Sequence, residues 1–362
     1  MREKIIQIIV VLVALLIGVF GTLYFTKDTN NKNISPVGIN KNITIKEGDS
    51  INASIQKIYN SVVVVESYKQ NQKVGAGSGF IYKKDDKHGY ILTNYHVVSG
   101  ATALKVIDMN NNQIDATYLG GDSYADIAVI RINADKVLDV AEIGDSTQSK
   151  LGDTVFTVGT PIDTEYMGSV TKGIISGESR TVTVTNNENG NYMMDVLQTD
   201  ASINPGNSGG PLVNINGEVI GITSMKLVTN SIEGMGFAIP IEIAMSSVDK
   251  LEKGEKIERP YIGVSMYDVG SMALYFRNDI KYDKNINNGA VIVNVEKDAD
   301  ADKAGLQAGD IILEMDGTKI KSTAHFKFLL YKHSNGDTIK LKVNRNGKEE
   351  NLKLKLTKNL GD

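Results

Sequence analysis

The chain has 362 residues, more than one hydrophobic core usually organises, so two or more folded units are expected. Its 39 basic and 43 acidic residues are mixed along the chain and give a formal net charge of −4. This argues against nucleic acid as a partner, because a phosphate backbone requires a basic stripe. The absence of cysteine excludes disulfides, thiolate metal sites and cysteine nucleophiles.

An apolar run occupies the N-terminus from Ile5 to Phe25. As a helix it would be roughly 32 Å long, and the hydrocarbon core of a bilayer is about 30 Å thick. Arg2 and Lys4 precede it and favour a cytoplasmic N-terminus. Residues 1–26 are therefore predicted to form a single-pass anchor in the cell membrane, with the rest of the chain on the extracytoplasmic side. The alternative is a cleaved signal peptide, although the run is longer than a signal core and lacks a small-residue cleavage site.

Residues 27–47 are polar and rich in Asn and Lys, which predicts a flexible tether. Short β-branched runs broken by Gly, Asn and Asp then fill residues 61–239, a pattern typical of an all-β barrel or sandwich. The dipeptides Asn189-Gly190 and Asn216-Gly217 predict tight hairpin turns.

The periodicity changes after Pro240. Apolar residues recur at helical spacing from Ile241 to Leu251, which predicts a helix that closes a first domain over residues 48–254. A charged linker leads to a second domain over residues 260–358. This domain has three strand-like runs, starting at Ala290, Asp310 and Thr338, and a predicted helix at 323–333.

The strongest chemical signal is GNSGGP, Gly206–Pro211. A serine hydroxyl is a weak nucleophile unless a base takes its proton and donors stabilise the oxyanion. Glycines on both sides of Ser208 let the backbone turn sharply, so that N–H groups converge on one oxygen. Gly206 and Ser208 are assigned as these donors, with Asn207 between them as part of the oxyanion hole. The alternative is a Gly-rich hairpin that carries an incidental serine.

A base and an orienting carboxylate precede this serine in the chain. His96, in TNYHVV, stands at the end of an apolar strand, and Asp126, in ADIAVIRI, opens an apolar run where a carboxylate can become buried. Either residue alone is more often structural. The order His, Asp, Ser is that of the chymotrypsin class. In that mechanism His96 takes the proton of Ser208 and returns it to the leaving amine, while Asp126 orients the imidazole.

The run QTDASINPGNSGGPLVNINGEVIGI (Gln198–Ile222), with TNYHVV and ADIAVIRI, resembles the HtrA/Deg serine proteases. The resemblance covers roughly residues 50–358. It implies a mainly β architecture, in which a chymotrypsin-like double β-barrel precedes a small α+β PDZ domain. It also implies a homotrimer and regulation by peptides bound to the PDZ domain.

Specificity is predicted from the residues that flank the nucleophile. In trypsin-like enzymes an aspartate six residues before the serine selects basic side chains. Here that position is Ser202, followed by Ile203. A pocket without a buried charge favours small or aliphatic side chains before the cut. Thr223, Ser224 and Met225 are expected to line one wall of this pocket.

In the second domain, YIGV is expected to capture a peptide C-terminal carboxylate, while the peptide adds as a strand to a sheet edge. The alternative is the first strand of a small domain. The segment between Asp268 and Gly289 is longer and more polar than such a domain needs. The carboxylate loop consists of Tyr261, Ile262, Gly263 and Val264.

No cofactor or metal is expected, because the sequence has no zinc or calcium ligand spacing. GAGSGF (Gly75–Phe80) is interpreted as a glycine-marked barrel strand, because it lacks the helix that a nucleotide loop requires.

Together with these patterns, the resemblance implies an ATP-independent, membrane-anchored serine endopeptidase for quality control of unfolded or damaged extracytoplasmic proteins. Two alternatives stay open. One is a narrow regulatory protease that cuts a single signalling partner, and the other is a chaperone-like binding module with minor proteolysis. The intact set of Ser208, His96 and Asp126 argues against a pure binding protein.

Overall fold

The computed structural model describes residues 2, 13–16, 47–160, 166–186, 190–227, 234–277 and 279–360. The chain divides into two units, Met1–Lys46 and Glu47–Asp362, and the second is compact. Within the described ranges, no helix is both long and apolar enough to cross a membrane. The predicted anchor and tether fall almost entirely outside those ranges, so they stay predictions.

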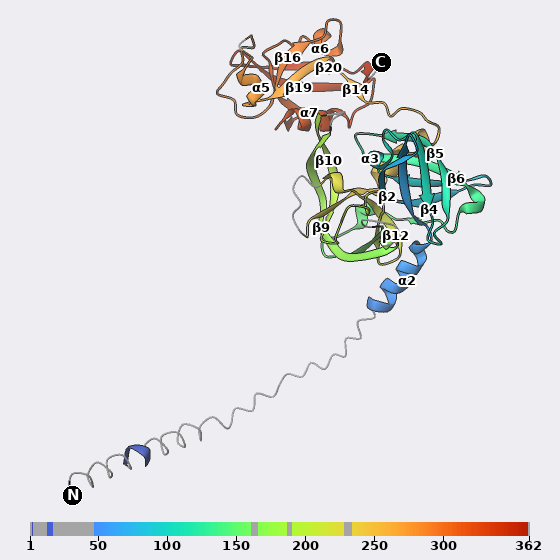
Figure 1. The fold of residues 1–362 in the computed structure, drawn as a ribbon. Helices are drawn as coiled ribbons and strands as arrows, with labels where there is room; N and C mark the ends of the chain where they lie inside the picture. Colours follow the sequence, from blue (N-terminus) through green and yellow to red (C-terminus); the bar gives the residue numbers. More distant parts are fainter. Residues whose placement is uncertain are drawn as a thin grey trace. The chain divides into compact units, whose positions relative to one another are not determined.

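The unit Glu47–Asp362 begins with helix α2 (Glu47–Tyr59) and a closed six-stranded antiparallel barrel (Figure 1). The strand order around this first barrel is β1-β2-β3-β6-β5-β4. The strands are β1 (Val62–Lys69), β2 (Gln72–Lys84), β3 (His88–Thr93), β4 (Ala103–Ile107), β5 (Gln113–Asp122) and β6 (Ile127–Asn133).

Strand β1 illustrates why its sequence is continuously apolar rather than alternating. Val63 and Val65 point into the first barrel, whereas Val62 joins a separate cluster outside it. Both faces of the strand are therefore buried, and both require apolar side chains.

A second sheet follows, with the order β11-β8-β9-β10-β13-β12-β7. An additional pairing of β11 with β12 closes six of its strands into a second barrel, and β7 lies parallel to β12 at the edge. The predicted turn at Asn216-Gly217 connects β11 to β12, with Gly217 at φ +78°. The other predicted turn includes Asn189, which lies outside the described residues. The strands are β7 (Glu142–Ile143), β8 (Thr154–Gly159), β9 (Ser169–Asn186), β10 (Gly190–Thr199), β11 (Pro211–Asn214), β12 (Glu218–Thr223) and β13 (Gly236–Pro240).

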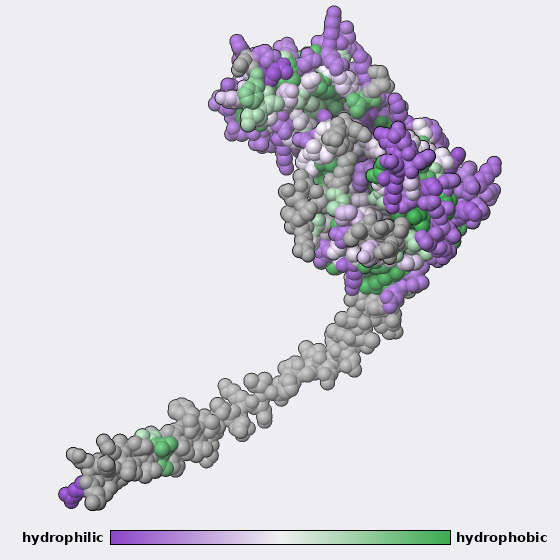
Figure 2. All heavy atoms as spheres, in the orientation of Figure 1, coloured by the Kyte–Doolittle hydropathy of each residue, from purple (hydrophilic) through white to green (hydrophobic). Residues whose placement is uncertain are grey.

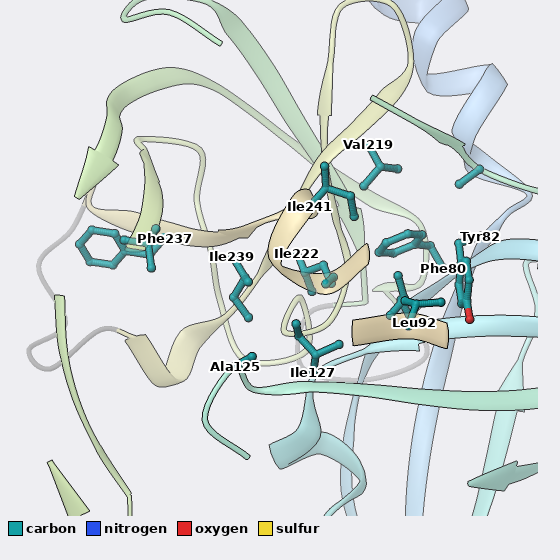
Figure 3. Packing of buried hydrophobic residues seen from close by; sticks show 14 of the residues in the cluster. Phe80, Tyr82, Leu92, Ala125, Ile127, Val219, Ile222, Phe237, Ile239 and Ile241 are labelled. Carbon is teal, nitrogen blue, oxygen red and sulfur yellow. The ribbon is translucent and has the colours of Figure 1, made fainter. Parts of the chain in front are cut away.

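The largest hydrophobic cluster joins the two barrels (Figure 3). Phe80 and Leu92 come from the first barrel, and Ile222 and Ile239 from the second; all four are fully buried. Helix α4 (Ile241–Glu252) contributes its apolar face to the same cluster, close to the predicted bounds. Burial of apolar surface contributes about 25 cal/mol per Å² to stability. Because this cluster takes side chains from both barrels, its burial holds the two barrels together.

The second domain is a sheet of order β15-β16-β17-β19-β20, with β18 beside β17 and a separate β14–β21 pair. Helix α7 is shorter than predicted, because Tyr331 is its C-cap. Strand β15 pairs only with β16 among the described strands, so its other edge is open. The elements are β14 (Pro260–Tyr261), β15 (Val264–Asp268), α5 (Met272–Tyr275), β16 (Ala290–Val295), α6 (Asp300–Lys303), β17 (Ile311–Met315), β18 (Thr318–Lys319), α7 (Thr323–Leu330), β19 (Thr338–Arg345), β20 (Lys348–Lys355) and β21 (Lys358–Asn359).

Candidate active site

His96 lies in a one-turn helix, α3 (Tyr95–Val98), rather than at the end of a strand as the sequence suggested. Strand β3 ends at Thr93, and the buried Asn94 is the N-cap of α3. The Asn94 Nδ2 donates to the backbone carbonyl of Asp126 at 2.9 Å, and Tyr95 N donates to the same carbonyl at 3.1 Å. The start of α3 is therefore tied to the segment that carries Asp126.

Asp126 lies between β5 and β6 and is fully buried. Its neighbours Ala125 and Ile127 belong to the cluster between the barrels (Figure 3). The residue has φ +55°, a left-handed conformation that is uncommon outside Gly, Asn and Asp. This conformation and the two apolar anchors fix the position of the carboxylate.

The Asp126 carboxylate binds His96 at two places. Oδ1 accepts the backbone N–H of His96 at 3.0 Å, and Oδ2 lies 2.8 Å from the ring Nδ1. The hydroxyl of Ser224 donates to Oδ2 at 3.0 Å. Three neutral groups therefore surround the charge, and they hold the imidazole in one orientation.

Ser208 lies in the turn that precedes β11. Its carbonyl accepts Ser78 N at 2.8 Å, and its Oγ accepts Met225 N at 3.0 Å. The hydrogen bonds of the described residues include none between Ser208 Oγ and His96. Gly209 has φ +86°, and a Cβ there would lie 2.2 Å from Ser78 O, so only glycine fits this turn.

The three predicted oxyanion residues differ in the use of their N–H groups. Asn207 N donates to Asn204 O at 3.0 Å, inside the turn. For Gly206 N and Ser208 N the contacts of the described residues include no acceptor. Gly206 has φ +104°, and its carbonyl accepts the Ser78 hydroxyl at 2.7 Å. Gly206 and Ser208 therefore keep the donors that an oxyanion requires.

The predicted pocket residues fall into two groups. Ser202 is exposed, and its carbonyl accepts Thr171 Oγ1 at 2.9 Å. Ile203 lies against Gly236, where a Cβ would be 2.6 Å from Ile203 Cγ1. Thr223 is fully buried, and its hydroxyl donates to Asn207 O at 2.6 Å. Thr223 thus holds the serine turn, as Ser224 holds Asp126.

Sequence reasoning missed the role of Ser78. It is fully buried and contacts both Gly206 and Ser208 through its hydroxyl and backbone N–H. A Cβ at Gly77 would lie 2.8 Å from Ser208 O, so the glycine beside Ser78 permits this close approach. The signal was present in GAGSGF, which had been interpreted only as a barrel strand.

The predicted carboxylate loop of the second domain lines a cavity of about 190 Å³ between β15 and α7. Gly263 has φ +76°, and a Cβ there would be 2.3 Å from Ala299 Cβ. Phe326 and Leu330 of α7 line the same cavity as Ile262 and Val264. An apolar groove beside an open strand edge fits an added peptide strand.

Tyr261, the first residue of this loop, donates its hydroxyl to Glu296. This hydrogen bond, with burial and the charge of Glu296, raises the pKa of Tyr261 to about 12. The phenol therefore stays neutral at physiological pH.

Comparison with known proteins agrees with both domains. Residues 77–222 match the trypsin-like peptidase domain and residues 260–356 the PDZ domain. The chain is 35% identical to the serine protease Do-like HtrA of Lactococcus lactis subsp. cremoris, over 96% of this chain and 93% of that protein. It is 41% identical to the serine protease Do-like HtrA of Lactobacillus helveticus, over 86% and 76% respectively.

Solved structures of similar proteins agree with the match to HtrA proteases. A serine endoprotease from Yersinia pestis is similar at a TM-score of 0.62 and 31% identity, covering 86% of this chain and 98% of that one. The HtrA-type protease AlgW with a decapeptide is similar at 0.63 and 26%, covering 85% and 98%.

The two barrels, the serine turn and the C-terminal sheet thus define a trypsin-like serine endopeptidase that carries one PDZ domain. The chain belongs to the HtrA family of Do-like serine proteases, as the sequence resemblance indicated.

Proposed function

We propose that this protease is ATP-independent, anchored in the cell membrane, and hydrolyses unfolded or damaged extracytoplasmic proteins through His96, Asp126 and Ser208. The observation that carries the proposal is the double attachment of His96 to the buried Asp126. A merely structural histidine does not need its ring and its backbone fixed by one carboxylate.

The proposed reaction follows the triad logic. Ser208 Oγ attacks the scissile carbonyl and passes its proton to His96 Nε2, the ring nitrogen that does not face Asp126. The N–H groups of Gly206 and Ser208 stabilise the oxyanion, and the C–N bond then breaks as His96 gives the proton to the leaving amine. Water that has lost a proton to His96 attacks the acyl-enzyme, and the proton returns to Ser208 Oγ as the acid product leaves. Because Ser208 Oγ accepts Met225 N in this structure, the hydroxyl has to rotate towards His96 before the attack.

The proposed specificity rests on Ser202, an uncharged residue where trypsin-like enzymes carry a carboxylate. Without that charge, small or aliphatic residues before the cut are favoured over Lys or Arg. Sequencing the cleaved products of a mixed peptide panel tests this, and mainly basic residues before the cut would refute it.

The location and the partners are also proposals. The apolar run Ile5–Phe25 supports a single-pass anchor with both domains outside the cytoplasm. The groove between β15 and α7 supports binding of peptide C-termini, and the similar AlgW structure contains a peptide. Membership of the HtrA family supports a homotrimer.

The decisive experiment treats the soluble unit Glu47–Asp362 with a fluorophosphonate serine probe and with an unfolded protein substrate. This unit contains every hydrophobic cluster of the described residues, so it is expected to fold alone. We expect labelling and cleavage, both absent in Ser208→Ala. Labelling and cleavage that persist in Ser208→Ala would refute the assigned nucleophile.

A further inference from the structure

Three large apolar side chains project from one turn of the PDZ domain. Met272, Tyr275 and Phe276, here called the α5 patch, are 73%, 79% and 71% exposed. The rings of Tyr275 and Phe276 lie edge to face at 5.6 Å. Figure 2 shows hydrophobic residues gathered over α5 and surrounded by hydrophilic ones. Single exposed apolar residues are ordinary, but a cluster of this kind marks an interaction surface.

An open cavity of about 1010 Å³ lies beside the α5 patch. Its walls combine polar side chains with apolar and aromatic ones, and the apolar and aromatic group includes Leu274, Tyr275, Phe276 and Tyr282. This size is at the upper end of what small-molecule sites use. It belongs to the segment between Asp268 and Gly289 that the sequence marked as unusually long. The insertion therefore builds a cavity that the peptide groove between β15 and α7 does not need.

The polar lining of this cavity has one sign of charge. Arg277, Lys281 and Lys284 line it, and none of the described lining residues is acidic. Arg277 is neutralised by Asp279 at 2.8 Å, but Lys281 and Lys284 are exposed and have no ion pair among the described contacts. Two free cations beside aromatic walls fit an anion that carries an apolar tail.

We propose that the α5 patch and its cavity bind an anionic phospholipid at the extracytoplasmic face of the membrane. Met272, Tyr275 and Phe276 enter the interfacial region, while Lys281 and Lys284 bind the headgroup phosphate. Apolar and aromatic side chains beside lysines are the composition that interfacial segments use.

The choice of a membrane as the occupant rests on the proposed anchor. The predicted tether of residues 27–47 is roughly 70 Å long at most when fully extended, so the proposed anchor would keep the start of the folded unit near the bilayer. An unfolded polypeptide without acidic residues would use the apolar patch but would leave both lysines without partners, so an acidic polypeptide is the alternative that vesicle binding has to exclude.

The test uses Glu47–Asp362 carrying Ser208→Ala, so that neither proteolysis nor the anchor affects the result. Co-sedimentation is measured with vesicles of phosphatidylcholine alone and with vesicles that also contain phosphatidylglycerol. We expect binding that requires phosphatidylglycerol and weakens as salt is raised. Replacing all three patch residues by serine should lower the partition coefficient by about tenfold or more. The double variant Lys281→Glu/Lys284→Glu should lose the dependence on phosphatidylglycerol.

Matched controls separate the site from general surface properties. Leu151→Ser removes an apolar residue that is 64% exposed in the protease domain, and Lys303→Glu/Lys319→Glu makes the same charge change elsewhere on the PDZ domain. Both should bind like the parent. Thermal unfolding checks that the patch variants are folded, which their exposure predicts.

Three outcomes would overturn the proposal: no binding to anionic vesicles, equal binding by parent and patch variant, or loss of binding in the controls as well. Capture of an unfolded acidic polypeptide by the patch, without vesicle binding, would assign the site to a polypeptide instead. If vesicle binding fails while Ser208-dependent labelling persists, the lipid site is refuted and the protease function stands.

Discussion

The two domains each bury an aspartate almost completely, but they treat its charge in opposite ways. Asp126 of the protease domain is 0% exposed and Asp310 of the PDZ domain 1%. Asp310 accepts two hydrogen bonds from the Arg345 guanidinium, from Nε and Nη2, both at 2.7 Å. The hydrogen bond to Asp310 is also the main cause that raises the pKa of Arg345, so the cation is permanent.

Asp126 has no such cation. Its partners are the Ser224 hydroxyl, the backbone N–H of His96 and the imidazole Nδ1. Removing a carboxylate from water costs several kcal/mol unless a counter-charge is present. In the PDZ domain that counter-charge is built in, whereas in the protease domain the proposed mechanism supplies it when His96 takes a proton. Under this proposal one buried carboxylate supports the fold, and the other serves the reaction.

The largest effect that this comparison predicts is on Asp126→Asn. The fold should survive, because neutral partners remain around the amide, but kcat should fall about 10⁴-fold, since the imidazole loses its orienting carboxylate. Steady-state cleavage of an unfolded substrate measures this. The matched change Asp310→Asn should leave the activity of the folded protein within a few-fold. Equal losses of activity in the two variants would break the comparison.

Chain order, turn glycines and apolar runs are local signals, and they led to the prediction of His96, Asp126 and Ser208. The structure brings His96 and Asp126 together, and the catalytic roles of all three stay a prediction. What the sequence could not predict were long-range partners: Arg345 is far from Asp310 in the chain, and nothing local joins Ser78 to Ser208.

Two positions show a further limit of sequence reasoning. Thr223 was expected in a pocket wall, but its small side chain is buried and holds the serine turn through hydrogen bonds. From the sequence, the segment that forms the cavity beside α5 stands out only by its length and polarity. The cavity itself is not predicted, because the residues of its walls follow neither a helical nor a strand period.

The second effect is on stability. Arg345→Met should leave the Asp310 carboxylate buried without a counter-charge, with the backbone N–H of Gln307 as its remaining donor among the described residues, which costs about 3–5 kcal/mol of PDZ stability. We expect the urea unfolding of the PDZ domain to move to lower concentration, while fluorophosphonate labelling of Ser208 is retained. The double variant Arg345→Met/Asp310→Leu should recover part of the loss, because no charge stays buried. A single variant as stable as the parent would show that Asp310 does not depend on this pair.

A smaller effect is expected for Ser224→Ala, which removes one neutral donor from Asp126. Hydrogen bonds to charged groups contribute about 1.5–3 kcal/mol, so kcat should fall by a factor of roughly 10 to 150. KM should change little, because Ser224 acts through Asp126 rather than on the substrate. Ser246→Ala is the control, since its hydroxyl bonds only a carbonyl of its own helix. A change in KM alone would make Ser224 a pocket residue instead.

The smallest effect concerns Glu66, a buried carboxylate in β1. Its donors include one cation, as for Asp310, and neutral groups, as for Asp126. Burial alone would raise its pKa, but hydrogen bonds from Lys73, Tyr68 and Gln113 outweigh burial and lower the pKa below the ordinary value of 4.5. A carboxylate with a lowered native pKa stabilises the fold above the unfolded value, and this contribution is lost as the pH falls through the native pKa.

Glu66→Gln should therefore lower the free energy of unfolding by about 1 kcal/mol at neutral pH, a modest loss because Lys73 is partly exposed. The difference from the parent should shrink as the pH is lowered below the ordinary glutamate pKa, since the parent then loses its charge as well. Urea unfolding of both proteins at several pH values measures this. A difference in free energy of unfolding that is constant with pH would mean that Glu66 contributes through packing. The effect of a balanced charge would then be limited to Asp126 and Asp310.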